Sequence, residues 1–492
     1  MSGSSEDSHS PGGVPHSPWE PPQSDLIPAE SPPGPGDPAV ATRNITTFLW
    51  FRVLFNSRFY YPIYTILFLD FGLTLEQFAT LNIVWAASIV VFEVPSGALA
   101  DRLGRRKLVV FSAMLMVVEM LILCLMPIGA GALTYGLFLI NRIVSGLAEA
   151  CCSGADEALV YDAIPPAGRN AAWTRVLARM MRWQSITFMM VALAGAATYS
   201  QDFMKHVPGL SGINRATCMR IPLWLNLGMA LATLAVSFRF IDTHPVSGPR
   251  VSLGRILHES FGQMVATGRW ILRSPAAVVL ILTGLLYDCF TRLFYTVGSN
   301  YYRLLGIDES CNGLILAGSS IIGIGTALAV EKLVGILKPS RNFGMVAGLI
   351  MAGLSGIALQ ITSWHGWAGV LFVVPFWLAM RSLHYFLSQY LNKVSDSSHR
   401  ATVLSFKGLT MNLAYALVMW FYAMQTAWLR RENAGELALL KKEDSDVRLL
   451  SLAMPWWPWI FAVLAVLLAG FVRLRYRKGL TALVADSAAS GE

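Results

Sequence analysis

The sequence predicts an all-α polytopic membrane protein with twelve transmembrane helices in two pseudo-symmetric six-helix bundles. Composition is the first observation: 54% of the residues are hydrophobic and 14% are charged, whereas about 25% are charged in soluble proteins. The second is a series of apolar runs of about 20 residues, the length that crosses a bilayer. The third is a repeat that relates the two halves of the chain.

The spans divide the chain into five parts. Residues 1–42 are rich in Ser, Pro and Gly, which predicts a disordered N-terminal tail. Residues 43–241 form the predicted N-terminal bundle, with spans near 47–70, 78–98, 108–128, 133–155, 175–199 and 221–241. Residues 275–476 form the predicted C-terminal bundle, with spans near 275–302, 310–333, 343–362, 366–390, 402–428 and 455–474. A linker (242–274) with an amphipathic helix joins them, and 477–492 form a C-terminal tail.

The net charge of +8 follows the predicted topology. With these spans, about 24 of the 38 Lys and Arg residues fall on one side of the membrane and about 9 on the other. Positive charges collect on the cytoplasmic side, so both termini are expected there, and the plasma membrane is the expected location. This distribution needs no nucleic-acid partner to explain it.

A repeat links the first span to the seventh. The first reads Arg58-Phe59-Tyr60-Tyr61 and then Gly72-Leu73; the seventh reads Arg292-Leu293-Phe294-Tyr295 and then Gly306-Ile307. Both matches have the same offset of 234 residues. One ungapped register over this length predicts two parallel six-helix halves.

The loop between the second and third spans carries the most specific motif. Its residues, 97–107, read Gly-Ala-Leu-Ala-Asp-Arg-Leu-Gly-Arg-Arg-Lys. This pattern resembles the signature loop between helices 2 and 3 of the major facilitator superfamily of secondary transporters. The resemblance implies that superfamily's fold, with alternating access to a site between the two bundles.

The same resemblance implies a cytoplasmic latch. Gly97 would let helix 2 approach a neighbour closely, and Asp101 would lie against the N-terminus of helix 11 near 401–404. The loop cations would meet carboxylates at the end of helix 4. The latch residues are therefore Gly97, Asp101, Arg102, Gly104, Arg105, Arg106, Asp156 and Glu157.

Four arginines fall within spans that line the central cavity in that superfamily. Ionisable groups inside a membrane are costly unless paired or hydrated, so they indicate function. Guanidinium groups suit carboxylate or phosphate ligands. With nearby tyrosines and a histidine, the predicted substrate cavity comprises Arg58, Tyr61, Tyr64, Arg142, Arg292, Tyr295, Arg381 and His384.

Structural pairing of these arginines is the alternative interpretation. Asp288 precedes Arg292 by four residues on the same helical face, and Glu149 is a candidate partner of Arg142. The intramembrane acids are also the candidates for proton coupling: Glu93, Glu119, Glu149 and Asp288.

The sequence therefore predicts a secondary transporter of a small organic anion or other polar metabolite, coupled to protons and monomeric in the bilayer. It contains no Walker loop and no catalytic constellation, so an enzyme is not predicted. The six cysteines lack metal-ligand spacing, and no metal or cofactor is expected. A drug–proton antiporter is the alternative, although span 5 lacks the Gly-Pro-rich motif of such exporters. A non-transporting receptor on this fold is more remote.

Overall fold

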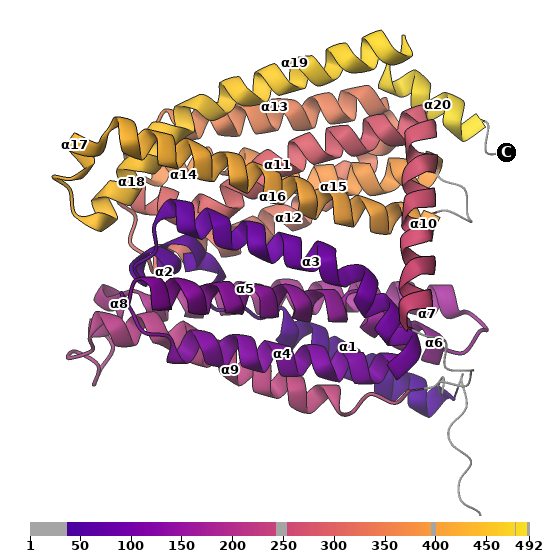
Figure 1. Cartoon of the computed structure of the whole chain (residues 1–492), viewed down its shortest axis with the longest axis horizontal. Helices are drawn as coiled ribbons and strands as arrows, with labels where there is room; N and C mark the ends of the chain where they lie inside the picture. The colour runs from indigo at the N-terminus through magenta and orange to yellow at the C-terminus, as the bar shows by residue number, and fades with distance from the viewer. Residues whose placement is uncertain (1–36, 243–252, 395–399, 478, 490–492) are drawn as a thin grey trace, which may run out of the picture. The chain divides into compact units, whose positions relative to one another are not determined.

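The computed structural model describes residues 37–242, 253–394, 400–477 and 479–489. All regular secondary structure in these residues is helical (Figure 1). Eight helical stretches among them are long and apolar enough to cross a membrane. Other predicted spans fall short of that criterion for local reasons: helix 1 is interrupted, and α7 carries several arginines.

The first half of the described chain forms the N-terminal bundle. It comprises α1 (Pro38–Phe55), η1 (Tyr61–Ile63), α2 (Tyr64–Asp70), α3 (Leu75–Leu103), α4 (Arg105–Leu125), α5 (Ala132–Cys152), α6 (Ala155–Ala163), α7 (Arg169–Tyr199), α8 (Gln201–Lys205) and α9 (Arg215–Ser237). The helix α10 (Leu253–Arg273) follows within the predicted linker and contacts α3, α11 and α16, so it runs across both bundles (Figure 1).

The second half forms the C-terminal bundle. It comprises α11 (Pro275–Leu304), α12 (Cys311–Ile336), α13 (Pro339–Ala358), α14 (Trp367–Leu371), α15 (Val374–Val394), α16 (Arg400–Glu432), α17 (Ala434–Leu437), α18 (Lys442–Ala453), η2 (Met454–Trp456), α19 (Trp457–Tyr476) and α20 (Leu480–Ala489).

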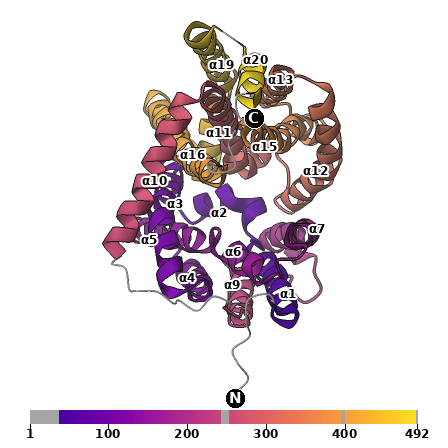
Figure 2. The same cartoon turned by 90° about the vertical axis from the view of Figure 1, so that its right-hand side faces the viewer.

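Each bundle has its own hydrophobic core, and two helix pairs make the most extensive contacts between them. The pair α3 and α16 makes extensive contact, and four residues of α2 and α3 belong to the C-terminal core: Leu69, Leu75, Ala79 and Ala86. The second pair is α7 and α12, which lie beside each other across the boundary (Figure 2). We call the end with residues 97–107 the loop end, and the opposite end the Asp70 end.

Helix 1 differs from its prediction in two ways. It begins at Pro38, inside the predicted tail, because Asp37 caps it by accepting a hydrogen bond from the Ala39 N–H and proline suits the first turn. The remaining tail, 1–36, lies outside the described residues. Helix 1 is also interrupted between Phe55 and Tyr61, just before Pro62, which has no N–H to continue a helical ladder.

The C-terminal segment predicted as a tail contains the packed helix α20. Its Leu483 and Val484 are buried, at 6% and 5% exposure, against the C-terminal core. Thr481 Oγ1 donates to Ser340 Oγ at 2.8 Å, which ties α20 to the start of α13. The apolar residues of this short segment therefore extend the bundle rather than leaving it in solution.

Candidate functional site

The interruption of helix 1 positions Arg58 deep in the N-terminal bundle. The Phe59 N–H donates to Asn226 Oδ1 of α9 at 2.6 Å, which replaces a lost helical bond. A Cβ on Gly195 of α7 would lie 1.8 Å from the Phe59 carbonyl oxygen, so only glycine allows this approach. Irregular backbone is stable within a membrane only where protein or a cavity surrounds it, and transporters use such interruptions at substrate sites.

A buried carboxylate joins two of the predicted arginines. Glu119 of α4 is 0% exposed and lies 3.5 Å from Arg58 Nη1 and 3.6 Å from Arg142 Nη2. Asn141 donates to the Glu119 carbonyl at 2.8 Å and accepts from Arg142 at 2.6 and 3.0 Å. The expected partner of Arg142, Glu149, is instead exposed and makes no ion pair in the described residues. Two arginines thus share one buried carboxylate.

The C-terminal bundle holds a second cluster, around Asp288 of α11. Asp288 is 1% exposed and pairs with Arg292 at 2.8 Å, as the four-residue spacing predicts. His384 Nε2 lies 3.5 Å from the other carboxylate oxygen. Arg292 also donates to Asn412 Oδ1 at 3.1 Å. A cation that the sequence interpretation missed, Lys407 of α16, lies within electrostatic reach of Asp288.

Hydrogen bonds connect the two clusters across the bundle boundary. Arg142 donates to the Tyr64 hydroxyl at 3.3 Å, and Tyr64 donates to Asn82 Oδ1 at 2.9 Å. Tyr415 of α16 donates to the same oxygen at 3.1 Å. The Arg292 guanidinium lies 5.2 Å from the centre of the Tyr415 ring. The chain from Arg142 to Arg292 therefore passes through Asn82 and Tyr415, neither of which was predicted.

Arg381 is the predicted cavity arginine with no carboxylate partner in the part of the chain that the structure describes. Its side chain is exposed and crosses Gly323 of α12, where a Cβ would lie 3.2 Å from Arg381 Nε. Tyr295 is half-buried and Tyr61 is 46% exposed, and among the described residues neither side chain makes a hydrogen bond to the two ion clusters.

The four proton-coupling candidates have different surroundings. Glu119 and Asp288 lie in the two clusters, whereas Glu93 and Glu149 do not. Oε2 of Glu93 on α3 is buried and has no hydrogen-bond partner in the described residues. Glu93 is thus a carboxylate with an unsatisfied oxygen, and Glu149 is a solvent-accessible one.

The predicted latch is divided in this structure. Arg105 pairs with Asp162, and Arg106 donates to the Phe238 carbonyl at 3.1 Å. Asp156 and Glu157 pair with Arg52 of α1, at 2.5 and 3.2 Å, instead of with the loop. The side chains of Asp101 and Arg102 lie outside the described residues, as do those at 401 and 402.

The latch glycines have separate roles. Gly104 joins α3 to α4 with a φ of 93°, a conformation that favours glycine. No heavy atom lies within 4 Å of the Cβ position of Gly97 in this conformation, so the close approach expected there stays a prediction.

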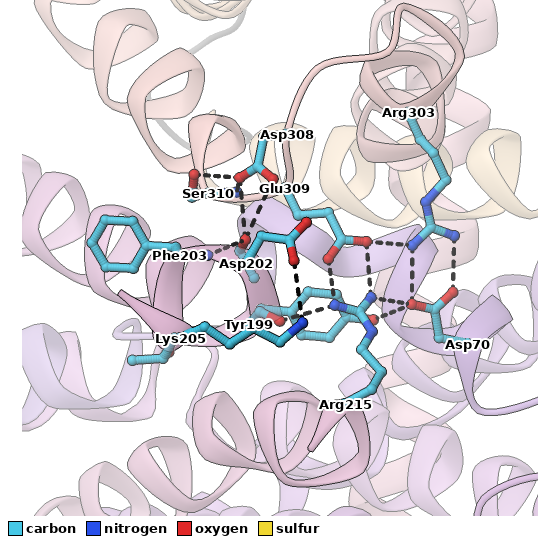
Figure 3. Close-up of polar contacts among 12 residues, drawn as sticks. Asp70, Tyr199, Asp202, Phe203, Lys205, Arg215, Arg303, Asp308, Glu309 and Ser310 are labelled. Atoms are coloured by element: carbon cyan, nitrogen blue, oxygen red, sulfur yellow. Dashed lines mark hydrogen bonds and ion pairs between the residues drawn. The ribbon is translucent and has the colours of Figure 1, made fainter. Parts of the chain in front are cut away.

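At the Asp70 end, a ring of four charged residues closes the boundary between the bundles (Figure 3). Asp70 binds Arg303 at 2.8 and 3.0 Å and Arg215 at 2.7 Å. Glu309 binds the same two arginines, at 2.5 to 2.8 Å. The Tyr199 hydroxyl donates to Asp70 at 2.7 Å. Asp70 and Arg215 belong to one bundle and Arg303 and Glu309 to the other, so the ring, which we call the Asp70 ring, holds the two together.

A second link at that end comes from the last turn of α16 and from α18. Arg430 binds Glu76 of α3 at 2.9 and 3.2 Å. Lys442 of α18 donates to the carbonyl oxygens of Leu69 and Leu73 at 2.9 and 2.8 Å. Cations of the C-terminal bundle thus cross the boundary and bind the N-terminal bundle.

Two helical bundles that meet around buried, paired charges define a polytopic membrane transporter fold. A family model of the Major Facilitator Superfamily matches residues 47–419. The chain belongs to this superfamily, and it is an integral membrane protein. No curated protein matches the sequence.

Solved structures share the fold at low sequence identity. A bacterial homologue of the human lysosomal transporter Spinster, inward-facing and unoccupied, has a TM-score of 0.66 at 12% identity, covering 92% of this chain and 99% of that one. The nucleoside transporter NupG has a TM-score of 0.60 at 11% identity, with 88% and 98% covered. A D-xylose-proton symporter has a TM-score of 0.58 at 15% identity, with 88% and 96% covered. These likenesses concern the fold alone.

Proposed function

We propose that the protein is a secondary active transporter of a small organic anion or other polar metabolite, coupled to protons and working by alternating access. The carrying observation is the pair of ion clusters connected across the bundle boundary through Asn82 and Tyr415. A solute between the bundles would touch both clusters, and competition for their hydrogen bonds would loosen the boundary.

The balance of charge supports an anionic substrate. Four cations lie close to the carboxylates of the two clusters, Arg58 and Arg142 to Glu119 and Arg292 and Lys407 to Asp288, and Arg381 is a fifth cation with no carboxylate partner in the described residues. Most are compensated by neighbouring acids, which leaves Arg381 as the one we assign to the substrate. A guanidinium without a carboxylate partner favours binding of a carboxylate or phosphate.

Proton coupling rests on the two buried carboxylates. Protonation of Glu119 would leave the buried Arg58 and Arg142 uncompensated, and protonation of Asp288 would do the same to the half-buried Arg292. Such a loss is costly, so it favours rearrangement of the cluster or binding of a substrate anion. The proton and the substrate anion would thus act on the same arginines, which couples the binding of one to the binding of the other. Glu93 and Glu149 stay candidates for the proton path.

The side of the membrane to which the central site opens is inferred from the end at which ion pairs join the two bundles. We propose that the loop end faces the cytoplasm, with both termini, in the plasma membrane. The Asp70 ring would then be the closed outer gate of an inward-facing state. The first structural neighbour, the Spinster homologue, is described as inward-facing, which supports this orientation.

A ligand screen tests the proposal. Thermal unfolding of the detergent-purified protein is measured against carboxylates, phosphorylated metabolites, sugars and lipophilic cations. A ligand at 100 times its dissociation constant should stabilise the folded state by about 2.7 kcal/mol. We expect anions to stabilise the wild type and the control Arg341→Gln, whose arginine is exposed at the start of α13, but not Arg381→Gln. Stabilisation by lipophilic cations alone would contradict the proposal and favour a drug–proton antiporter.

A further inference from the structure

A row of arginines on α7 lies outside both ion clusters and the Asp70 ring. Arg175, Arg179 and Arg182 follow at intervals of four and three residues, so they share one helical face. All three side chains are exposed, and none makes an ion pair in the described part of the chain. No acidic residue occurs anywhere in α7. We call these three residues the α7 stripe.

The stripe lies beside the face of α7 that packs on the core of its own bundle. The side of α7 that packs on that core carries Trp173, Val176, Met180 and Trp183. Trp183 contacts Trp50 of α1 with ring centres 5.4 Å apart. At 100° per residue the arginines centre about a third of a turn away from these residues, on a neighbouring face, and all three are exposed, so they do not serve the packing of the N-terminal bundle.

The stripe continues into the face that α7 presents to the other bundle. Leu193 follows Arg182 by eleven residues, about three turns, and therefore lies on the same line along the helix. There α12 covers the face closely: a Cβ on Gly313 would lie 2.9 Å from Leu193 Cα and 2.4 Å from the Ala192 carbonyl oxygen. Nearer the loop end the same face is exposed at the arginines, so the stripe is accessible there.

The spacing of the stripe suits an oxyanion. Arg175 and Arg182 are seven residues apart, about 10 Å along the helix axis. Long arginine side chains on adjacent turns can converge on one phosphate or carboxylate, and guanidinium groups bind such oxyanions in bidentate fashion. Three uncompensated cations would also raise the local concentration of anions.

We propose that the α7 stripe is a second anion site, which binds a phosphate- or carboxylate-bearing ligand that approaches between α7 and α12 from the loop end. The binding does not depend on the proposed transport function. If the ligand is the transported solute, the stripe holds it before or after it occupies the central site. The same chemistry also fits the phosphate of an anionic lipid headgroup.

The test uses the full-length protein in neutral detergent, without added lipid. The probes are inorganic pyrophosphate and citrate, at constant ionic strength, and the readout is the midpoint of thermal unfolding. The variant Arg175→Gln/Arg179→Gln/Arg182→Gln is compared with Arg473→Gln/Arg475→Gln/Arg477→Gln. The latter removes three exposed cations near the end of α19 and so matches the charge change.

The stripe variant is expected to need at least tenfold more anion for the same stabilisation, whereas the α19 variant responds like the wild type. Equal loss in both variants, or no loss in either, would overturn the proposal. If the triple variant does not fold, the single variants Arg175→Gln and Arg179→Gln are used instead. Each is expected to lose part of the stabilisation by pyrophosphate and by citrate, and no loss in either would overturn the proposal.

Two further arms separate the ligand sources and the two sites. Short-chain phosphatidylglycerol replaces the soluble anions in one arm; a response to this lipid alone, lost in the stripe variant, identifies a headgroup site. In the other, Arg381→Gln is combined with each probe. Stripe binding that persists in Arg381→Gln upholds the second site even if the central anion site fails its own test.

Discussion

Tyr64 and Tyr415, which belong to different bundles, donate hydrogen bonds to the same atom, Asn82 Oδ1, at 2.9 and 3.1 Å. Asn82 is 2% exposed, so water does not readily replace either bond when it breaks. One amide oxygen thereby connects the cluster around Glu119 to the cluster around Asp288. A conformational change that separates the bundles has to break this connection.

Tyr415→Phe is expected to weaken the closed boundary. The change removes the bond to Asn82 and the 2.8 Å bond to Thr296 Oγ1, each with a net worth of about 1 kcal/mol. The measurement is thermal unfolding in detergent. The control is Tyr385→Phe, whose side chain is 38% exposed. Equal unfolding midpoints for the two variants would mean that the connection does not stabilise this state.

Asp70→Asn is expected to open the Asp70 end. It removes the charge that both Arg303 and Arg215 bind, and leaves these arginines to Glu309 alone. The measurement is the rate at which a membrane-impermeant maleimide labels Cys311, at the start of α12, after replacement of the other five cysteines. We expect labelling to accelerate several-fold.

The matched control for this gate is Asp202→Asn. Asp202 pairs with Lys205 at 3.5 Å within a single short helix, so its loss leaves the boundary intact. An equal acceleration in both variants, or none in Asp70→Asn, would show that the Asp70 ring does not hold the gate closed.

Gly195→Ala is expected to be strongly destabilising. The new methyl group would meet the Phe59 carbonyl oxygen, which is backbone and fixed by the interruption of helix 1. Overpacking of this kind costs about 1–3 kcal/mol or more. Gly136→Ala in α5 is the control, because its Cβ position has no atom within 4 Å. If both variants unfold at the same temperature, α7 does not approach helix 1 as described.

Glu119→Gln is expected to destabilise the protein more than Glu149→Gln. The first change leaves Arg58 and Arg142 buried without a carboxylate, a loss that costs about 3–5 kcal/mol. Glu149 is exposed and makes no ion pair in the described residues, so its replacement should be nearly neutral for stability. The measurement is the free energy of unfolding of both variants in denaturant. A larger loss of stability in Glu149→Gln than in Glu119→Gln would contradict the assignment of Glu119 to the cluster.

The sequence was sufficient for the fold because the decisive signals are local or periodic. Apolar runs set the spans, the loop at 97–107 identified the superfamily, and the offset of 234 residues revealed the two halves. The repeat also has a structural counterpart that was not foreseen: the Thr65 N–H donates to Ser299 Oγ at 3.0 Å, and these residues are equivalent in the repeat. The pseudo-symmetric helices thus meet at equivalent positions.

The partners of the charged residues were less predictable, because they depend on contacts between distant helices. The pair of Asp288 and Arg292 could be predicted from the sequence, since both residues lie on one helix four positions apart. The role of Glu119 was not, because it depends on how α4 faces helix 1 and α5. The repeat contained one indication of the Asp70 ring that the sequence interpretation did not use. The offset of 234 residues carries Asp70 to the position next to Arg303, and the two residues have opposite charges.

Uptake into proteoliposomes under an imposed pH gradient tests the central claim most directly. The labelled solutes are the carboxylates and phosphorylated metabolites that stabilise the protein in the ligand screen. The account predicts that a pH gradient drives accumulation of at least one of these anions, and that Arg381→Gln abolishes it while Arg341→Gln does not. Accumulation of no anion, or uptake that is indifferent both to the gradient and to Arg381→Gln, would contradict a proton-coupled anion transporter.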